Sequence, residues 1–344
     1  MSFSLRAGPP LEPPHHRVGR STTTLVDTAR AGRVVVVDTW YPAAPAAGSE
    51  PSAYELLPGV GFTANADQDA AMAAGSFPLV LWSHGRTGTR SSYALLCEAI
   101  AARGFVVIAP DHAGDVLADW LLGTNVDDET NEANRVEDAR FVLDTALDPD
   151  GPLAAFGRGI DPDRIAVAGH SYGGFTALTL AGGAVPDRRL RAVAGLQALT
   201  RTIPKQVLER VEIPVLLVTG SNDTTTPPET DADRAWAKLA ARPAWRVDIE
   251  RAGHQGCSDV GLYLELAPQV EGLPDFVHDY VTSMAADVTG TAGDPWRDTV
   301  ALHVRILAAF LGASLAIDVA AATREIDAVS ILPGVAVTRR GAFA

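Results

Sequence analysis

An apolar run that ends abruptly in a glycine-flanked serine constrains the fold of this chain more than any other feature. Residues 164–174 read Arg-Ile-Ala-Val-Ala-Gly-His-Ser-Tyr-Gly-Gly, and a helix-like stretch follows at 175–181. A strand that turns sharply into a helix strains its middle residue, and Gly169 and Gly173 lack the side chains that would clash in so tight a turn. We therefore expect Ser171 to stand at the carboxyl edge of a sheet, where backbone strain is usually kept for chemistry. The alternative is an ordinary glycine-rich turn.

Strand-like and helix-like segments alternate along most of the chain. Apolar strands are expected at 77–83, 105–109, 164–170, 190–195, 213–219 and 245–249, and helices at 91–103, 131–147, 175–182, 231–241 and 296–311. Most of these strands are unbroken apolar runs, which is typical of a parallel sheet covered on both faces. The sequence therefore predicts an α/β fold with a mostly parallel central sheet, which binds its ligand beyond the carboxyl ends of the strands.

No linker divides the chain, so we expect a single domain over 21–344, preceded by an irregular segment over 1–20. Two strand-like runs are expected between 21 and 41. Residues 43–77 are rich in Ala, Gly, Pro and Ser, which predicts a long surface loop with one short helix at most. An insertion is expected at about 255–295, and its apolar residues form either an acyl pocket or lid, or ordinary packing. These residues are Leu262, Tyr263, Leu264, Leu266, Phe276, Val277, Tyr280 and Met284.

Composition limits the possible partners and locations. Hydrophobic residues make up 47% of the 344 residues, and the net charge of −14 argues against binding to nucleic acid or to anionic membranes. No apolar stretch reaches the roughly 18 residues of a transmembrane segment, and the N-terminus lacks a signal-peptide core. We expect a cytoplasmic location, and secretion stays open because a removed signal would leave the same trace. The oligomeric state is not indicated.

The two cysteines, Cys97 and Cys257, form neither a disulfide framework nor a zinc-binding pattern. A disulfide between the two stays open. Asp111 and His112 are adjacent, so their side chains point apart, which indicates a structural turn rather than a metal pair.

A serine hydroxyl needs a base to take its proton and an acid to orient that base. In a sheet of this type the chain order is serine, acid, histidine, with each residue at the end of a later strand. Asp223 follows the expected strand at 213–219 and is the candidate acid, although a turn aspartate is the alternative. Asp231 and Asp259 are its competitors.

His254 is the candidate base because it follows the expected strand at 245–249 and comes after the acid. His170 adjoins the serine, but strand alternation predicts that it points to the opposite side. The remaining histidines precede the fold, lie in helix-like stretches or end earlier strands; they are His15, His16, His84, His112, His278 and His303.

An oxyanion hole requires two backbone N–H groups that point at the developing negative charge. Tyr172, directly after the serine, is the first candidate donor. Arg86, in the loop after the strand at 77–83, is the second, because a His-Gly pair at 84–85 follows that strand. The alternative for this pair is a simple tight turn.

With these residues in view, the chain resembles the α/β-hydrolase superfamily over roughly residues 20–312. It is most similar to dienelactone-hydrolase-like serine esterases, a group that includes platelet-activating-factor acetylhydrolases and, more distantly, cutinase-like polyesterases. The resemblance is carried by Asp38-Thr-Trp-Tyr-Pro42, Leu81-Trp-Ser-His-Gly85, Ala168-Gly-His-Ser-Tyr-Gly-Gly174 and Gly253-His-Gln255.

By this resemblance Ser171 attacks the ester, His254 relays the proton, Asp223 orients the imidazole, and the Arg86 and Tyr172 N–H groups hold the oxyanion. No metal or cofactor is implied. Dienelactone hydrolases proper use cysteine, so their substrate does not carry over. The acetylhydrolases often have phenylalanine after the nucleophile and an apolar residue after His-Gly, and the departures here count against a phospholipid substrate.

The sequence thus predicts a serine hydrolase for small-molecule carboxylic esters with an apolar acyl part. A thioesterase, amidase, lactonase or polyester hydrolase would use the same three residues. A catalytically silent binding protein of the same fold is the alternative from outside the enzymes.

Overall fold

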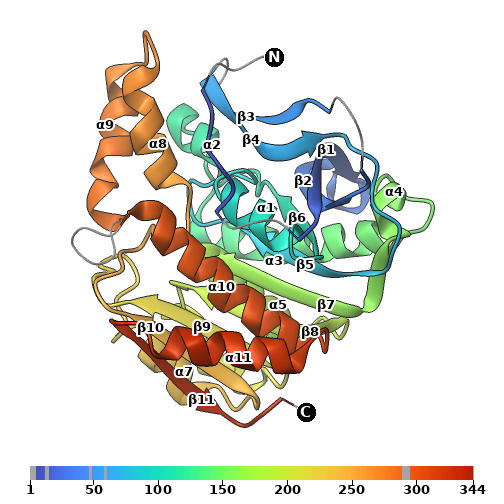
Figure 1. Cartoon of the computed structure of the whole chain (residues 1–344), viewed down its shortest axis with the longest axis vertical. Helices are drawn as coiled ribbons and strands as arrows, with labels where there is room; N and C mark the ends of the chain where they lie inside the picture. The colour runs from blue at the N-terminus through green and yellow to red at the C-terminus, as the bar shows by residue number, and fades with distance from the viewer. Residues whose placement is uncertain (1–4, 12–14, 46–48, 58–59, 289–294, 344) are drawn as a thin grey trace.

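Eleven strands form one sheet in the computed structural model, which describes residues 5–11, 15–45, 49–57, 60–288 and 295–343 (Figure 1). The sheet order is β11-β10-β9-β8-β7-β5-β6-β2-β1-β4-β3. Neighbouring strands from β6 to β10 pair in parallel, whereas β2, β1 and β11 join the sheet through antiparallel pairs. The strands are β1 (Arg17–Asp27), β2 (Arg33–Ala43), β3 (Pro51–Leu57), β4 (Val60–Gln68), β5 (Phe77–Ser83), β6 (Val106–Pro110), β7 (Ile160–His170), β8 (Leu190–Leu196), β9 (Val215–Gly220), β10 (Ala244–Ile249) and β11 (Val335–Arg340).

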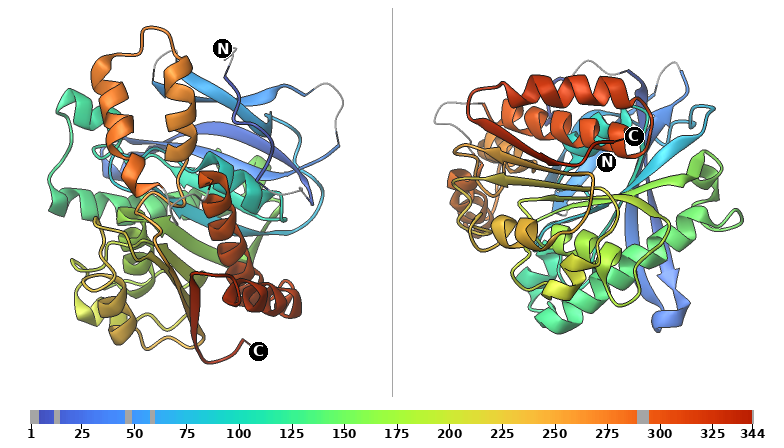
Figure 2. Two further views of the ribbon diagram at one scale, coloured as in Figure 1. Left: turned by 60° about the vertical axis from the view of Figure 1, so that its left-hand side comes forward. Right: turned by 90° about the horizontal axis from the view of Figure 1, so that it is seen from below.

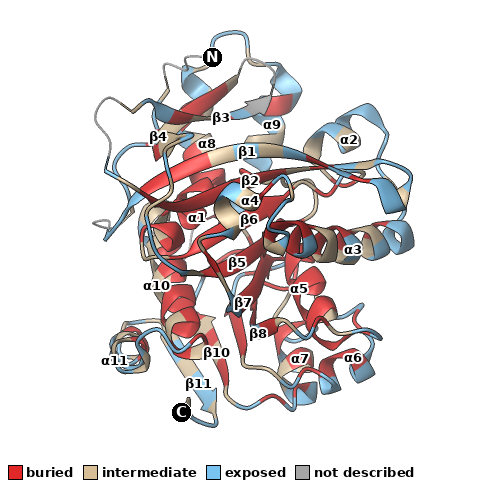
Figure 3. Cartoon of the chain, turned by 90° about the vertical axis from the view of Figure 1, so that its right-hand side faces the viewer, coloured by how far each residue is buried: buried red, intermediate tan, exposed pale blue. Residues whose placement is uncertain are grey.

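Helices cover both faces of the sheet, and the buried strands between them are shown in Figure 3. The α-helices of the described residues are α1 (Ala94–Ala101), α2 (Leu117–Leu122), α3 (Asp128–Leu147), α4 (Ala154–Gly157), α5 (Tyr172–Gly182), α6 (Lys205–Glu209), α7 (Ala232–Lys238), α8 (Val260–Leu266), α9 (Asp275–Ser283), α10 (Trp296–Ser314) and α11 (Val319–Ser330). Three short 3-10 helices are η1 (Thr28–Arg30), η2 (Ala267–Gln269) and η3 (Ala285–Asp287). The predicted α/β architecture, with a mostly parallel sheet and helices on both faces, is confirmed.

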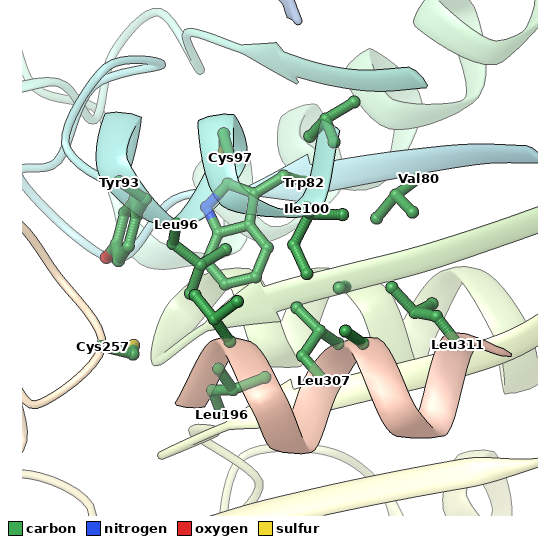
Figure 4. Packing of buried hydrophobic residues seen from close by; sticks show 14 of the residues in the cluster. Val80, Trp82, Tyr93, Leu96, Cys97, Ile100, Leu196, Cys257, Leu307 and Leu311 are labelled. Carbon is green, nitrogen blue, oxygen red and sulfur yellow. The ribbon is translucent and has the colours of Figure 1, made fainter. Parts of the chain in front are cut away.

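Strand β5 shows how the sequence builds two separate cores. Consecutive side chains of a strand point to opposite faces, so Trp82 packs with α1 and α10 (Figure 4). Leu81 packs with α3 and α5 on the other face. Both side chains are almost fully buried. Burial of a large apolar side chain contributes about 1.5–3 kcal/mol, which explains why an unbroken apolar run is stable between two helical layers.

The predicted loop over 43–77 is wrong in its central part, where β3 and β4 form an antiparallel hairpin. Tyr54 and Phe62 lie opposite each other in this hairpin, are fully buried and stack at 5.1 Å between ring centroids. The Tyr54 hydroxyl also accepts a hydrogen bond from Trp40 Nε1 at 2.8 Å. Cross-strand aromatic packing of this kind outweighs the turn-like composition of the segment.

The N-terminal boundary also differs from expectation. Strand β1 begins at Arg17, inside the segment expected to be irregular, and pairs along its whole length with β2. Position 19 of this strand favours glycine, because an added Cβ would stand 2.4 Å from the Tyr41 ring. Arg6 forms an isolated bridge with Thr63 of β4, so part of the segment before β1 is attached to the sheet. Residues 1–4 and 12–14 lie outside the described residues.

The expected insertion is helical. Helices α8 and α9 form a hairpin, orange in Figures 1 and 2, that stands on one side of the sheet. Residues 289–294 of the expected insertion lie outside the described residues. No helix within the described ranges is long and apolar enough to cross a membrane.

Candidate active site

Ser171 occupies a strained turn between β7 and α5. Its backbone has φ 55° and ψ −116°, values that a residue with a side chain rarely adopts. An added Cβ at Gly173 would lie 1.8 Å from the Ser83 carbonyl oxygen, and one at Gly169 would lie 2.3 Å from that of Gly173. Both glycines are therefore required by close backbone approach, as the sequence predicts.

The structure brings Ser171, His254 and Asp223 into one hydrogen-bonded line. Nε2 of His254 lies 2.9 Å from the Ser171 hydroxyl oxygen, and Nδ1 lies 2.8 Å from Oδ2 of Asp223. These residues meet because β7, β9 and β10 are parallel and end at the same edge of the sheet. An ionised carboxylate only accepts hydrogen bonds, so neutral His254 carries its proton on Nδ1, and Nε2 is free to accept the serine proton.

Asp223 is held in its ionised form. Burial alone would raise the pKa of this carboxyl, but hydrogen bonds from His254 and Thr226 outweigh burial and lower the pKa below its usual value. Thr226 donates its N–H to Oδ1 at 2.7 Å, and its hydroxyl lies 2.7 Å from Oδ2. The competitors contact other groups, since Asp231 accepts the Thr200 N–H and Asp259 accepts the Leu95 N–H.

The two candidate oxyanion donors belong to two different segments of the chain. Tyr172 is the first residue of α5, and Arg86 lines the same cavity as Ser171. Within the described part of the chain, neither backbone N–H has a hydrogen-bond acceptor. A helix N-terminus and a free N–H on a neighbouring loop are the groups that an anionic oxygen requires.

The prediction that His170 points away from the site is wrong. Its Nε2 donates to the carbonyl oxygen of His254 at 2.7 Å, and its Nδ1 accepts from the Tyr93 hydroxyl at 2.6 Å. Strand alternation is kept, since His170 contacts Tyr93 on the same face of the sheet as Ala166 and Ala168. The prediction fails because the His254 ring, 4.6 Å from that of His170, packs on this face too. Burial lowers the pKa of His170 well below its usual value, so the ring is neutral.

Tyr93 extends this connection to the loop that holds Arg86. Its hydroxyl oxygen accepts the Gly85 N–H at 3.2 Å while its proton goes to His170. The two side chains therefore connect the backbone of His254 to the loop that holds Arg86. The sequence did not identify His170 or Tyr93 as part of the site. Nothing in the local pattern near Tyr93 indicates a partner 77 positions away.

A largely apolar cavity of about 330 Å³ lies above Ser171 and His254. The helical hairpin supplies much of its wall, through Val260, Tyr263, Leu266, Ala267, Val270, Leu273, Val277, Tyr280, Val281 and Met284. Tyr280 also forms a hydrogen bond of 2.8 Å with the Thr87 hydroxyl, beside Arg86. In contrast, Leu262 packs in the core and Phe276 is exposed, so the insertion contributes both pocket wall and ordinary packing.

Other candidates from the sequence have structural partners. Asp111 accepts a hydrogen bond from the Arg90 N–H, whereas His112 contacts Ser83 and lies 3.2 Å from Asp138, so the adjacent side chains do point apart. Cys97 and Cys257 are both free and buried.

The buried histidine His303 allows the structure to be tested through the pH dependence of stability. His303 accepts a hydrogen bond from Gln197 at 2.9 Å, and burial lowers its pKa to about 4. In the unfolded chain a histidine titrates near 6.5. Between these values only the unfolded state binds the proton, so acidification favours unfolding.

We therefore expect the stability advantage of the wild type over His303→Gln to fall by up to about 3 kcal/mol between about pH 7 and about pH 4. Urea unfolding of both proteins at each pH measures this difference. A difference that does not change with pH would show that His303 is not buried as a neutral ring.

Comparisons with known proteins agree with the geometry of the site. A family model described as Chlorophyllase matches residues 69–210. Cutinase est2 of Thermobifida alba is 42% identical over 99 residues, which are 29% of this chain and 28% of the cutinase. Cutinase 2 of Thermobifida cellulosilytica is 34% identical over 157 residues, which are 46% of this chain and 52% of the cutinase. The chain thus spans about half, or less, of the length of these curated relatives.

A solved structure extends the similarity over almost the whole chain. The ferulic acid esterase from Streptomyces cinnamoneus superposes with a TM-score of 0.74 and is 27% identical. The match covers 92% of this chain and 94% of the esterase. The sheet order, the strained serine turn and this match together show that the chain belongs to the α/β-hydrolase superfamily.

Proposed function

We propose that this protein is a serine hydrolase that cleaves carboxylic esters through an acyl-enzyme intermediate on Ser171. The observation that carries the proposal is the unbroken hydrogen-bonded line from Ser171 through His254 to Asp223 beneath an apolar cavity. Relatives named as cutinases and as a ferulic acid esterase support the same class of reaction.

In the first half of this reaction the Ser171 oxygen attacks the ester carbonyl carbon while its proton passes to Nε2 of His254. The carbonyl oxygen becomes an oxyanion that accepts hydrogen bonds from the N–H groups of Arg86 and Tyr172. The carbon–oxygen bond to the alcohol then breaks, and the alcohol leaves with the proton from His254. Asp223 keeps the imidazole oriented and stabilises its protonated form.

In the second half a water molecule attacks the acyl-serine carbonyl. His254 takes a proton from this water, the same two N–H groups hold the second oxyanion, and the serine oxygen leaves and regains its proton. The products are the free acid and the regenerated enzyme. The alcohol carries away the original Ser171 proton, and water supplies the proton that Ser171 regains, so the cycle balances without a cofactor.

The cavity indicates what the acyl part of the substrate resembles. Its wall from the helical hairpin is almost entirely apolar, so an uncharged apolar acyl group of small to medium size fits it best. Similarity to cutinases makes a polymeric ester the second candidate. The small-molecule ester stays our preferred substrate class, and a cytoplasmic location stays a prediction.

A series of p-nitrophenyl esters of rising acyl length tests the proposal. We expect turnover to rise from acetate to a medium-chain ester and then to fall. Val277 lines the cavity, and Val277→Trp should fill part of it. This variant should lower kcat/KM for the medium-chain ester by about tenfold or more, because each apolar contact that the acyl chain loses weakens transition-state binding by ~1–3 kcal/mol. Acetate turnover should be nearly unchanged.

Val185→Trp is the control for this series, since Val185 is 70% exposed and is not among the residues that line the cavity. Folded wild-type protein that hydrolyses no ester or thioester in the series would instead support a silent binding protein.

A further inference from the structure

Arg135 is a fully buried arginine that the proposed reaction does not use. It lies on α3 and pairs with Asp115, with Nη2 and Nε at 2.7 and 3.0 Å from Oδ2 of the carboxylate. Asn131 donates to the same oxygen at 2.9 Å and fixes the carboxylate from a second side. Moving an ion pair out of water costs free energy, so a buried pair contributes little net stability. Packing alone therefore does not explain why Arg135 and Asp115 are buried.

The remaining contacts of Arg135 are one to the Ser83 hydroxyl at the end of β5, 3.4 Å from Nη1, and others to the segments that carry the two proposed oxyanion donors. Nη1 donates to the carbonyl oxygen of His84 at 2.8 Å, and Nη2 lies 3.3 Å from that of Gly85. The guanidinium carbon also stands 5.1 Å from the centre of the Tyr172 ring. One rigid, planar cation thus contacts both the Arg86 loop and the residue after the nucleophile.

These contacts set the direction of the Arg86 N–H, because of the geometry of the peptide unit. The Gly85 carbonyl and the Arg86 N–H belong to one planar peptide unit and point in opposite directions. The Gly85 oxygen accepts from Arg135, from Nδ1 of His84 at 2.7 Å and from the Gly88 N–H at 3.1 Å. Because the carbonyl is held on one side, the Arg86 N–H must point to the other side.

His84 can donate in this arrangement because its protons are fixed. Its Nε2 accepts the His112 N–H at 3.1 Å, so the proton of the neutral ring is on Nδ1. Burial and the nearby Arg135 charge lower the pKa of His84 well below its usual value, which keeps the ring neutral. The Thr87 N–H binds the Asp115 carbonyl oxygen at 3.1 Å and fixes the next peptide of the loop.

We propose that Arg135 is a positioning residue that holds the oxyanion hole in its productive geometry. It does so by fixing the Gly85–Arg86 peptide plane from behind and by packing against Tyr172. This inference rests on the proposed esterase function, because the anion that these N–H groups would hold is the oxyanion of ester cleavage. Arg135 itself does not touch the substrate.

Arg135→Met tests this inference, with Arg20→Met as a matched control. Arg20 is also buried, pairs with Asp38 at 2.6 Å, donates to the Ala53 carbonyl oxygen at 2.8 Å and stacks 4.3 Å from the centre of the Tyr54 ring. The two arginines therefore have the same kinds of contact, but only Arg135 contacts the proposed oxyanion loop. Both variants should lose stability to a similar degree, as thermal unfolding measures.

Only Arg135→Met should lose catalysis. We expect its kcat on the best p-nitrophenyl ester to fall by about 10²-fold, the cost of one misplaced oxyanion donor, while KM changes by less than about threefold. The inhibition constant of an alkyl trifluoromethyl ketone, which forms a tetrahedral oxyanion on the serine, should rise in the same proportion as kcat falls. Arg135→Lys, which keeps the charge but not the planar fork, should lie between the two.

Folded Arg135→Met with wild-type kcat, or an equal loss of kcat in Arg20→Met, would overturn the inference. If Arg135→Met does not fold, Arg135→Lys decides, and an unchanged inhibition constant in that variant would also overturn the inference. These results differ from a failure of the proposed function, in which the wild type itself would hydrolyse no ester.

Discussion

Ser171→Ala is expected to lower kcat for a carboxylic ester by about 10⁴-fold or more. Alanine leaves the cavity and the oxyanion donors in place but removes the oxygen that forms the acyl bond. The same substitution should abolish covalent labelling by a fluorophosphonate. Steady-state kinetics and mass spectrometry of the labelled protein measure the two effects.

Stability should change little in this variant. Ser171 has φ 55°, and alanine in that conformation is strained to a similar degree, so the cost is already present in the wild type. The thermal midpoint should therefore stay close to that of the wild type. Ser258→Ala is the control, because Ser258 is buried, lines the same cavity and has no proposed role in catalysis. Labelling that persists without Ser171 would place the nucleophile elsewhere.

Asp223→Asn is expected to lower kcat by about 10³–10⁴-fold, less than the loss of the serine. The amide keeps the shape of the carboxylate, but its NH₂ group favours the His254 tautomer whose proton is on Nε2. That nitrogen then cannot accept the serine proton. The loss should appear in kcat with little change in KM, which steady-state kinetics separates.

Asp231→Asn and Asp259→Asn are matched controls for this assignment. Both residues are buried, and the backbone N–H groups of Thr200 and Leu95, rather than His254, donate to Asp231 and Asp259 respectively. Both variants should lose stability, but the folded protein should keep most of its kcat. A larger loss of kcat in either control than in Asp223→Asn would contradict the choice of acid.

The parts of the fold that sequence predicts well are those in which one local pattern has one physical cause. Unbroken apolar runs such as 77–83 require cover on both faces, and glycines at 169 and 173 are required by backbone contact. The order of Ser171, Asp223 and His254 follows from strands that end at one edge. Their positions are thus visible in the sequence, although their distances are not.

The parts that sequence reasoning missed depend on contacts between distant segments. The β3–β4 hairpin is stabilised by Tyr54 and Phe62 against the core, despite a turn-like composition. His170 contacts the site because the distant loop that carries His254 packs on the same face of the sheet. Arg135 lies in a helix of ordinary polar composition, and only the fold brings it 2.8 Å from the His84 carbonyl oxygen.

The central claim is that Ser171 is a nucleophile whose adduct oxygen lies between two backbone N–H groups. A crystal structure of the wild type inactivated by an alkyl fluorophosphonate tests it most directly. We predict a phosphorus–oxygen bond to Ser171, with the phosphoryl oxygen within hydrogen-bond distance of the Arg86 and Tyr172 nitrogens and the alkyl chain in the cavity beneath α8 and α9. An adduct on another residue, or a phosphoryl oxygen that contacts neither nitrogen, would contradict the account.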